Sequence, residues 1–171
     1  MGLVTLLAPV LFGLAAGAGA AVLVDIDAPM FVSVGETFVI DVRIGSVEGL
    51  DAAQFSIGYD ATIVQLLDDD VALGPDFPDS GGVSVSPAQG GSSLVVVNFI
   101  GFSGVAGGGS LVRLPFQTLA GGSTSLGLSD VLLGDGGGRT IPTLVAPPVV
   151  VDVGVEPAFE KRSDWVYDPP P

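Results

Sequence analysis

Five aspartates in one short stretch are the residues of this sequence best suited to bind a metal ion. Asp68, Asp69 and Asp70 are consecutive, and Asp76 and Asp79 follow shortly after. Such oxygen-rich clusters suit Ca²⁺, which takes about six to eight oxygen ligands. The D-x-[DN]-x-[DN]-G order of an EF-hand loop is missing, so two interpretations stay open. Asp68, Asp70, Asp76 and Asp79 are candidate calcium ligands, or the stretch is a solvated acidic loop, which we favour.

The residue types that most catalytic sites need are absent or scattered. There is no histidine and no cysteine, which excludes Ser-His-Asp and Cys-His nucleophilic sites and the usual zinc sites. A glycosidase needs two carboxylates about 5–10 Å apart, but with 19 acidic residues some pair lies close by chance. Glu36 and Glu48 fall in predicted turns with no cleft implied. We therefore expect a protein that is not an enzyme and that needs no cofactor, with calcium as the one ion left open.

The excess of acidic over basic residues argues against two classes of partner, nucleic acids and anionic lipid surfaces. Five basic and 19 acidic residues give a formal net charge of -14. Nucleic acid binding depends on Lys and Arg at the phosphates, and anionic lipid surfaces repel a chain of this charge. We expect no nucleic acid partner and no membrane contact beyond an N-terminal signal segment, and we interpret the acidity as a source of solubility.

Alternating side chains organise residues 32–60. In the first half of this segment every second residue is apolar: Phe38, Ile40, Val42 and Ile44. The second half repeats the pattern with Ala53, Phe55, Ile57 and Tyr59. This period of two predicts two strands, each with one buried face. Residues 45–50 are the predicted turn between them.

Strand-like segments continue along the chain at short spacing. They lie at 22–27, 62–67, 82–86, 94–102, 111–119, 125–133 and 149–153, with predicted turns at 104–109 and 134–139. The chain also contains 26 Gly and 13 Pro. About nine short strands with many turn residues predict an all-β sandwich or barrel.

The order of these pieces resembles the cohesin domain, a module of cellulosome scaffoldins and of non-cellulosomal secreted proteins. The resemblance covers roughly residues 21–153 and is carried by VGETFVIDVRI, GLDAAQFSIGYD, GGSLVRLPF, LGLSDVLLGDGGGRTIP and VVVDV. The most specific piece is 53–60, which ends in Tyr59-Asp60. The resemblance implies an all-β, nine-stranded jelly-roll β-sandwich that binds another protein.

The resemblance also implies where a partner would bind. Cohesins similar to this chain bind a calcium-loaded dockerin module through a sheet face that includes the outward side of the third strand. In type I members that strand offers an Asn and an Asp, and the matching positions here are Ala52 and Gln54. The predicted partner-binding face is therefore made of Ala52, Gln54 and Ser56. Because Ala52 and Gln54 replace the Asn and Asp of type I cohesins, whether this chain binds a type I dockerin stays open. The alternative is an ordinary solvated strand face.

A carbohydrate-binding module, with polysaccharide as the partner, is the second hypothesis. Sugar platforms need exposed, coplanar aromatic rings. Phe77 and Phe102 are the aromatic residues expected in loops, and Trp165 and Tyr167 lie in the C-terminal tail. An exposed aromatic row would favour a glycan, and a flat face around Gln54 would favour a protein.

The two ends of the chain differ in composition from the rest. The first 24 residues carry no charge, and Ala18-Gly19-Ala20 fits a small-residue cleavage site. The prediction is a signal peptide at 1–20, a cohesin-like domain at 21–154 and a Pro-rich linker or tail at 155–171. An uncleaved membrane anchor is the alternative for the first segment. We expect an extracellular, secreted protein, which the sequence also allows to sit at the cell surface.

Overall fold

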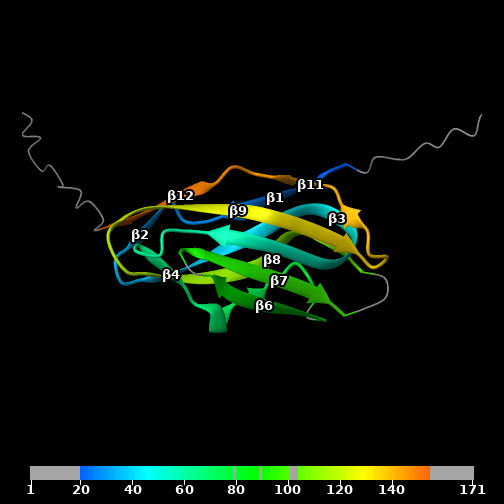
Figure 1. The fold of residues 1–171 in the computed structure, drawn as a ribbon, viewed down its shortest axis with the longest axis horizontal. Coiled ribbons are helices and arrows are strands. Elements are labelled where there is room, and N and C mark those ends of the chain that lie inside the picture. The colour runs from blue at the N-terminus through cyan, green and yellow to red at the C-terminus, as the bar shows by residue number, and fades with distance from the viewer. Residues whose placement is uncertain (1–19, 79, 89, 101–103, 155–171) are drawn as a thin grey trace, which may run out of the picture.

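The computed structural model describes residues 20–78, 80–88, 90–100 and 104–154, and this part of the chain is almost entirely β-structure (Figure 1). The strands are β1 (Val22–Asp27), β2 (Phe31–Ser33), β3 (Thr37–Gly58), β4 (Val64–Leu66), β5 (Ala72–Leu73), β6 (Gly81–Ala88), β7 (Ser92–Phe99), β8 (Val105–Thr118), β9 (Gly122–Asp135), β10 (Thr140–Ile141), β11 (Thr143–Val145) and β12 (Val149–Gly154). A short 3-10 turn, η1 (Asp68–Asp70), separates β4 from β5.

The predicted signal peptide and the predicted tail lie outside the described residues, apart from Ala20. Phe102, Trp165 and Tyr167 lie outside them as well. Within the described ranges, no helix is long and apolar enough to cross a membrane.

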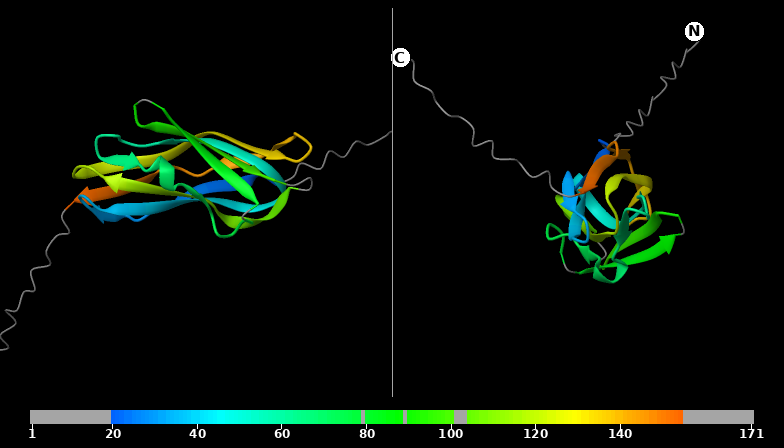
Figure 2. Two further views of the ribbon diagram at one scale, coloured as in Figure 1. Left: turned by 90° about the horizontal axis from the view of Figure 1, so that it is seen from below. Right: turned by 90° about the vertical axis from the view of Figure 1, so that its left-hand side faces the viewer.

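Strand β3 organises the fold because it belongs to both layers of a β-sandwich. Its first half pairs with β1 and β8, and its second half pairs with β7 and β9. The first layer therefore contains β11, β1, the first half of β3, and β8, with β4 and β5 also paired to β8. The second layer has the order β9, β3, β7 and β6. Figure 2 shows the sandwich from its side and from one end.

The predicted turns at 45–50 and 104–109 are both wrong. Strand β3 runs through 45–50, and β8 begins at Val105 and pairs with it through register shifts. Val47 and Leu50 are buried, so their side chains hold β3 on the core through these bulges. A Cβ atom on Gly108 would lie 3.0 Å from the backbone of Gly45. The glycines of these two segments therefore let β3 and β8 approach each other closely, and neither strand ends at them.

The strand count differs from the nine that were predicted, because twelve strand segments occur in the described part of the chain. The two strands predicted within 32–60 are one continuous strand, β3. Four short segments carry too few residues to show a period: β2, β5, β10 and β11. The predicted all-β sandwich architecture is confirmed.

The alternation along β3 predicts the core correctly. Buried positions on this strand include Phe38, Ile40, Val42, Ile44, Ala53, Phe55 and Ile57. Phe116 of β8 lies among the core aromatic residues, with its ring centroid 5.8 Å from that of Phe38 and 5.2 Å from that of Tyr59. Phe77 lies in a loop as expected, but its ring is buried against Phe99 at 5.7 Å. It is therefore not available as an exposed aromatic platform.

Candidate partner-binding face

The three predicted face residues lie on the outer side of the second layer. Ala53, Phe55 and Ile57 are buried in the core. Because side chains alternate along a strand, Ala52, Gln54 and Ser56 point to the opposite side. Each of the three is partly exposed.

The strand register places other outward residues beside them. Gln54 lies between Val96 of β7 and Leu132 of β9. Ser56 lies between Leu94 and Ser129, and Ala52 lies between Asn98 and Gly134. Strand β6 extends the same side with Gly82, Ser84 and Ser86. We call these residues the candidate face: Ala52, Gln54, Ser56, Gly82, Ser84, Ser86, Leu94, Val96, Asn98, Ser129, Leu132 and Gly134.

The candidate face carries no charged side chain, although the whole chain has a net charge of -14. Its side chains are small, aliphatic, hydroxyl or amide. Leu132 is 52% exposed. A surface of this kind suits contact with a complementary protein surface, where apolar burial is combined with a few hydrogen bonds.

A depression of about 400 Å³ lies at one end of the candidate face. Its lining includes five residues of the candidate face: Ala52, Gln54, Val96, Asn98 and Leu132. Three charged residues also line it: Asp51, Asp135 and Arg139. Ser56 does not line it. Two of the three predicted residues therefore share a concave site with residues of β7 and β9 that the sequence analysis missed.

The turn after β9 closes this end of the face. The Asp135 carboxylate accepts hydrogen bonds from the backbone N–H of Gly137 at 2.9 Å and of Arg139 at 2.8 Å. The backbone N–H of Asp135 donates to the carbonyl of Arg139 at 2.9 Å. These bonds hold Arg139 in a defined turn beside the depression.

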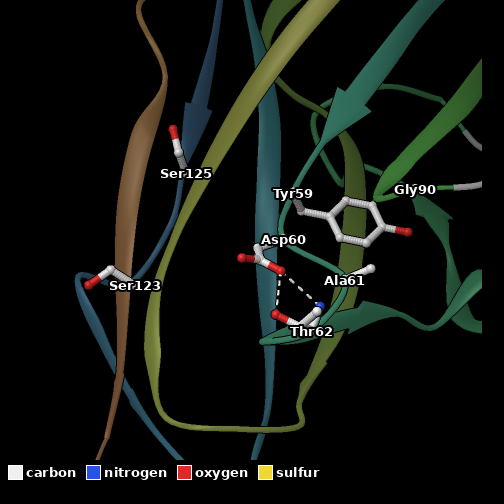
Figure 3. Close-up of a pocket in the computed structure, with 7 residues that line it drawn as sticks. All are labelled: Tyr59, Asp60, Ala61, Thr62, Gly90, Ser123 and Ser125. Atoms are coloured by element: carbon white, nitrogen blue, oxygen red, sulfur yellow. Dashed lines mark hydrogen bonds between the residues drawn. The ribbon is translucent and has the colours of Figure 1, made fainter.

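A second depression, of about 640 Å³, is lined by Tyr59, Asp60, Ala61, Thr62, Gly90, Ser123 and Ser125 (Figure 3). The Asp60 carboxylate accepts hydrogen bonds from the hydroxyl of Thr62 at 2.6 Å and from its backbone N–H at 2.9 Å. These bonds, the hydroxyl bond first, hold the pKa of Asp60 below its ordinary value of 3.8. Asp60 is thus ionised and already engaged at neutral pH.

The bonding around Asp60 is structural. Its backbone N–H donates to Thr124 Oγ1 at 3.0 Å, and the backbone N–H groups of Ile63 and Val64 donate to its carbonyl. Ser123 donates its hydroxyl to Asp152. Asp60 is the only carboxylate that lines this depression among the described residues. The pair of carboxylates that a glycosidase requires is not assembled there.

The described part of the acidic stretch forms a turn and a loop, and its carboxylates are not gathered in one cluster. Asp68, Asp69 and Asp70 make up η1, and the Asp76 carboxylate accepts a hydrogen bond from the backbone N–H of Ser110 at 2.7 Å. No group of three or more acidic, histidine or cysteine side chains in the described ranges could hold a metal ion. Asp79 lies outside those ranges. Calcium binding by Asp68, Asp70, Asp76 and Asp79 stays the untested alternative to the solvated acidic loop that we favour.

Exposed aromatic rings do not form a row in the described part of the chain. Phe31 is 40% exposed, whereas Phe77, Phe99 and Phe116 are buried. Tyr59 is partly buried, and its hydroxyl lies 3.2 Å from Ser93 Oγ. The described residues therefore form no aromatic platform of the kind that sugars stack on, while Phe102, Trp165 and Tyr167 lie outside the described ranges.

Comparisons with known proteins identify the family. The cohesin module of a family 33 glycoside hydrolase from Clostridium perfringens superposes with a TM-score of 0.68 at 21% identity, covering 80% of this chain and 98% of that module. A non-cellulosomal cohesin from Archaeoglobus fulgidus gives 0.65 at 15% identity, with 80% and 93% covered. The sixth cohesin of Acetivibrio cellulolyticus scaffoldin B, solved in complex with a Cel5 dockerin, gives 0.63 at 17% identity, with 80% and 99% covered.

These structural similarities, all below 25% identity, concern the fold. No curated protein matches the chain. The family model described as "Cohesin domain" matches residues 22–145, which is more than half of the sequence. The chain therefore belongs to the cohesin family.

Proposed function

We propose that this protein is an extracellular, non-catalytic binding module that assembles with a second protein through the candidate face. The observation that carries the proposal is a four-stranded outer face without charge on a strongly acidic chain. A monomer gains solubility from surface charge. A face that lacks it while exposing Leu132 and parts of Leu94 and Val96 is suited to burial against a partner.

A dockerin-type module is the proposed class of partner. Support comes from the cohesin of Acetivibrio cellulolyticus that was solved with a Cel5 dockerin. In this chain the recognition would differ from the type I pattern, because Ala52 and Gln54 offer no carboxylate. We place the protein outside the cell, in a system for adhesion or polysaccharide degradation. The support is the apolar, uncharged start of the sequence.

A pull-down with matched variants tests the proposal. The full chain is immobilised and exposed, with calcium present, to the proteins and polysaccharides that the source organism secretes. Gln54→Arg places a long cation in the middle of the candidate face. Val39→Arg makes the same change on the same strand, but on the outer side of the first layer, where Val39 is 37% exposed.

The expected result is a protein that wild type and Val39→Arg retain and Gln54→Arg loses. Recovery of polysaccharide and no protein would instead favour the carbohydrate-binding alternative. Equal retention by both variants would mean that the partner does not use this face.

A further inference from the structure

Strand β9 contains a bulge directly beside Gln54 and Ser56. Gln54 pairs with Leu132 and Ser56 pairs with Ser129, so β9 has one more residue than β3 over this step. Val131 packs against the core, opposite the buried Phe55. Asp130 is therefore the extra residue of the bulge. Bulges of this type redirect a side chain and often lie beside functional sites.

The conformation of Asp130 is unusual for a residue with a side chain. Its φ angle is 52°, in the left-handed region that L-residues disfavour. In the described part of the chain, every other residue with positive φ is a glycine, nine in all. Among the described residues, Asp130 alone keeps a Cβ and a charge in such a conformation. Glycine would fit here without strain, so the backbone does not require this carboxylate.

The Asp130 carboxylate also makes few interactions that would stabilise the fold. Asp60, Asp76 and Asp135 each accept at least one backbone N–H bond. In the described ranges, Asp130 accepts only the hydroxyl of Ser129, at a long 3.3 Å, and pairs with no basic side chain. Ser129 belongs to the candidate face and pairs with Ser56. The carboxylate therefore lies exposed at the edge of that face, close to Leu132 in sequence.

We propose that Asp130 is a specificity-determining residue, the charged anchor that receives a Lys or Arg side chain of the protein partner. This inference rests on the proposed function of the candidate face. The other acidic side chains that border the face, Asp51 and Asp135, lie at the depression together with Arg139. The bulge sets Asp130 apart from them, beside Gln54 and Ser56, so that its carboxylate can fix the orientation of the partner. The basic side chain would be flanked by apolar residues that cover Leu132 and Val96. The net charge of -14 also favours the approach of a partner surface that carries positive charge.

Two variants separate the charge of Asp130 from its role in the bulge. Asp130→Asn removes the charge and keeps a residue type that tolerates positive φ. Asp130→Gly removes the side chain and relieves the backbone, so its melting temperature should equal or exceed that of the wild type. Asp69→Asn is the control, because it removes the same charge from an exposed residue of η1.

The probe is the set of proteins that the source organism secretes, captured on the full chain and quantified by mass spectrometry. Asp130→Asn and Asp130→Gly should each retain at least about fivefold less of the protein that wild type retains, and Asp69→Asn should retain as much. Raising NaCl from about 0.1 M to about 1 M should weaken capture by wild type more than capture by Asp130→Asn.

Two outcomes would overturn the inference, and they are distinguishable. If Gln54→Arg abolishes capture while Asp130→Asn retains as much as wild type, the face binds a partner but Asp130 does not anchor it. If Gln54→Arg and wild type capture equally, or neither captures a protein, the proposed function fails and the role of Asp130 fails with it.

Discussion

The carboxylate of Asp60 and the side chain of Thr62 lock the turn that follows β3. The Thr62 hydroxyl donates at 2.6 Å and the Thr62 backbone N–H donates at 2.9 Å to the same oxygen, Oδ1. Both bonds favour the ionised carboxylate, which is why the pKa of Asp60 lies below 3.8. An aspartate side chain often accepts the backbone N–H two residues ahead of it, and the Thr62 bond to Asp60 is of this kind.

The first prediction concerns the pH dependence of this turn. Because the pKa of Asp60 is lower in the folded than in the unfolded state, the folded state binds fewer protons. The stabilisation is fully present above the unfolded pKa and is lost as the pH falls through the folded pKa. Thr62→Val removes the hydroxyl bond and should raise the pKa of Asp60 toward 3.8. NMR titration of the Asp60 side-chain carboxyl carbon measures this pKa.

Thr62→Ser is the matched control for this titration. It keeps the hydroxyl and should leave the pKa of Asp60 low. An unchanged pKa in Thr62→Val would mean that the hydroxyl bond is not what stabilises the charge.

The second prediction concerns the aromatic core. Phe116 is completely buried and touches the rings of Phe38 and Tyr59. Phe116→Ala should lower the free energy of unfolding by about 3–5 kcal/mol, because it removes a large side chain and leaves a cavity. Phe31→Ala makes the same change at a ring that is 40% exposed and should cost about 1 kcal/mol or less. Urea denaturation of both variants measures the difference, and similar losses would contradict the assigned core.

Burial along β3 could be predicted because a period of two requires no knowledge of neighbouring strands. Phe38, Ile40 and Phe55 face the core as that pattern indicates. The continuity of β3 through 45–50 could not be predicted in the same way. Gly45 and Gly49 are typical turn residues, whereas the pairing with β8 that keeps this segment extended joins residues far apart in the sequence.

The candidate face could be predicted only in part. The alternation along β3 predicts that Gln54 and Ser56 lie on the outer side. Ala52, and the role of this side in binding a partner, were implied by the resemblance to cohesins. Their neighbours Leu132 and Val96 depend on strand register, and on β9 the register includes an extra residue at Asp130. A positive φ at a non-glycine residue leaves no distinct signal in the sequence, because aspartate is common in turns and loops.

The third prediction concerns calcium and Asp76. The Asp76 carboxylate already accepts the backbone N–H of Ser110 at 2.7 Å. Asp76→Ala should therefore lower the stability by about 1 kcal/mol, by the same amount with calcium or with EDTA. Asp69→Ala, in η1, is the control and should change the stability little. A melting temperature that rises with millimolar Ca²⁺ in the wild type, and not in Asp76→Ala, would instead assign Asp76 to a calcium site.

The fourth prediction compares two adjacent glycines that precede β7. Gly90 and Gly91 have φ angles of 86° and 81°, so alanine is strained at both positions. A Cβ on Gly90 meets nothing within 4 Å, whereas a Cβ on Gly91 would lie 2.2 Å from the carbonyl oxygen of Tyr59. Tyr59 also donates its backbone N–H to the carbonyl of Gly91 at 2.8 Å. The end of β3 is therefore held directly against Gly91.

The two alanine variants should differ in stability for this reason. Gly90→Ala should lower the free energy of unfolding by about 1 kcal/mol, from backbone strain alone. Gly91→Ala adds a steric clash with Tyr59 and should lower it by about 2–4 kcal/mol. Urea denaturation of both variants gives the two losses, and the m-value checks that unfolding exposes a similar surface in each. Equal losses would mean that Tyr59 does not approach Gly91 as closely as this, because strain in φ is common to both variants.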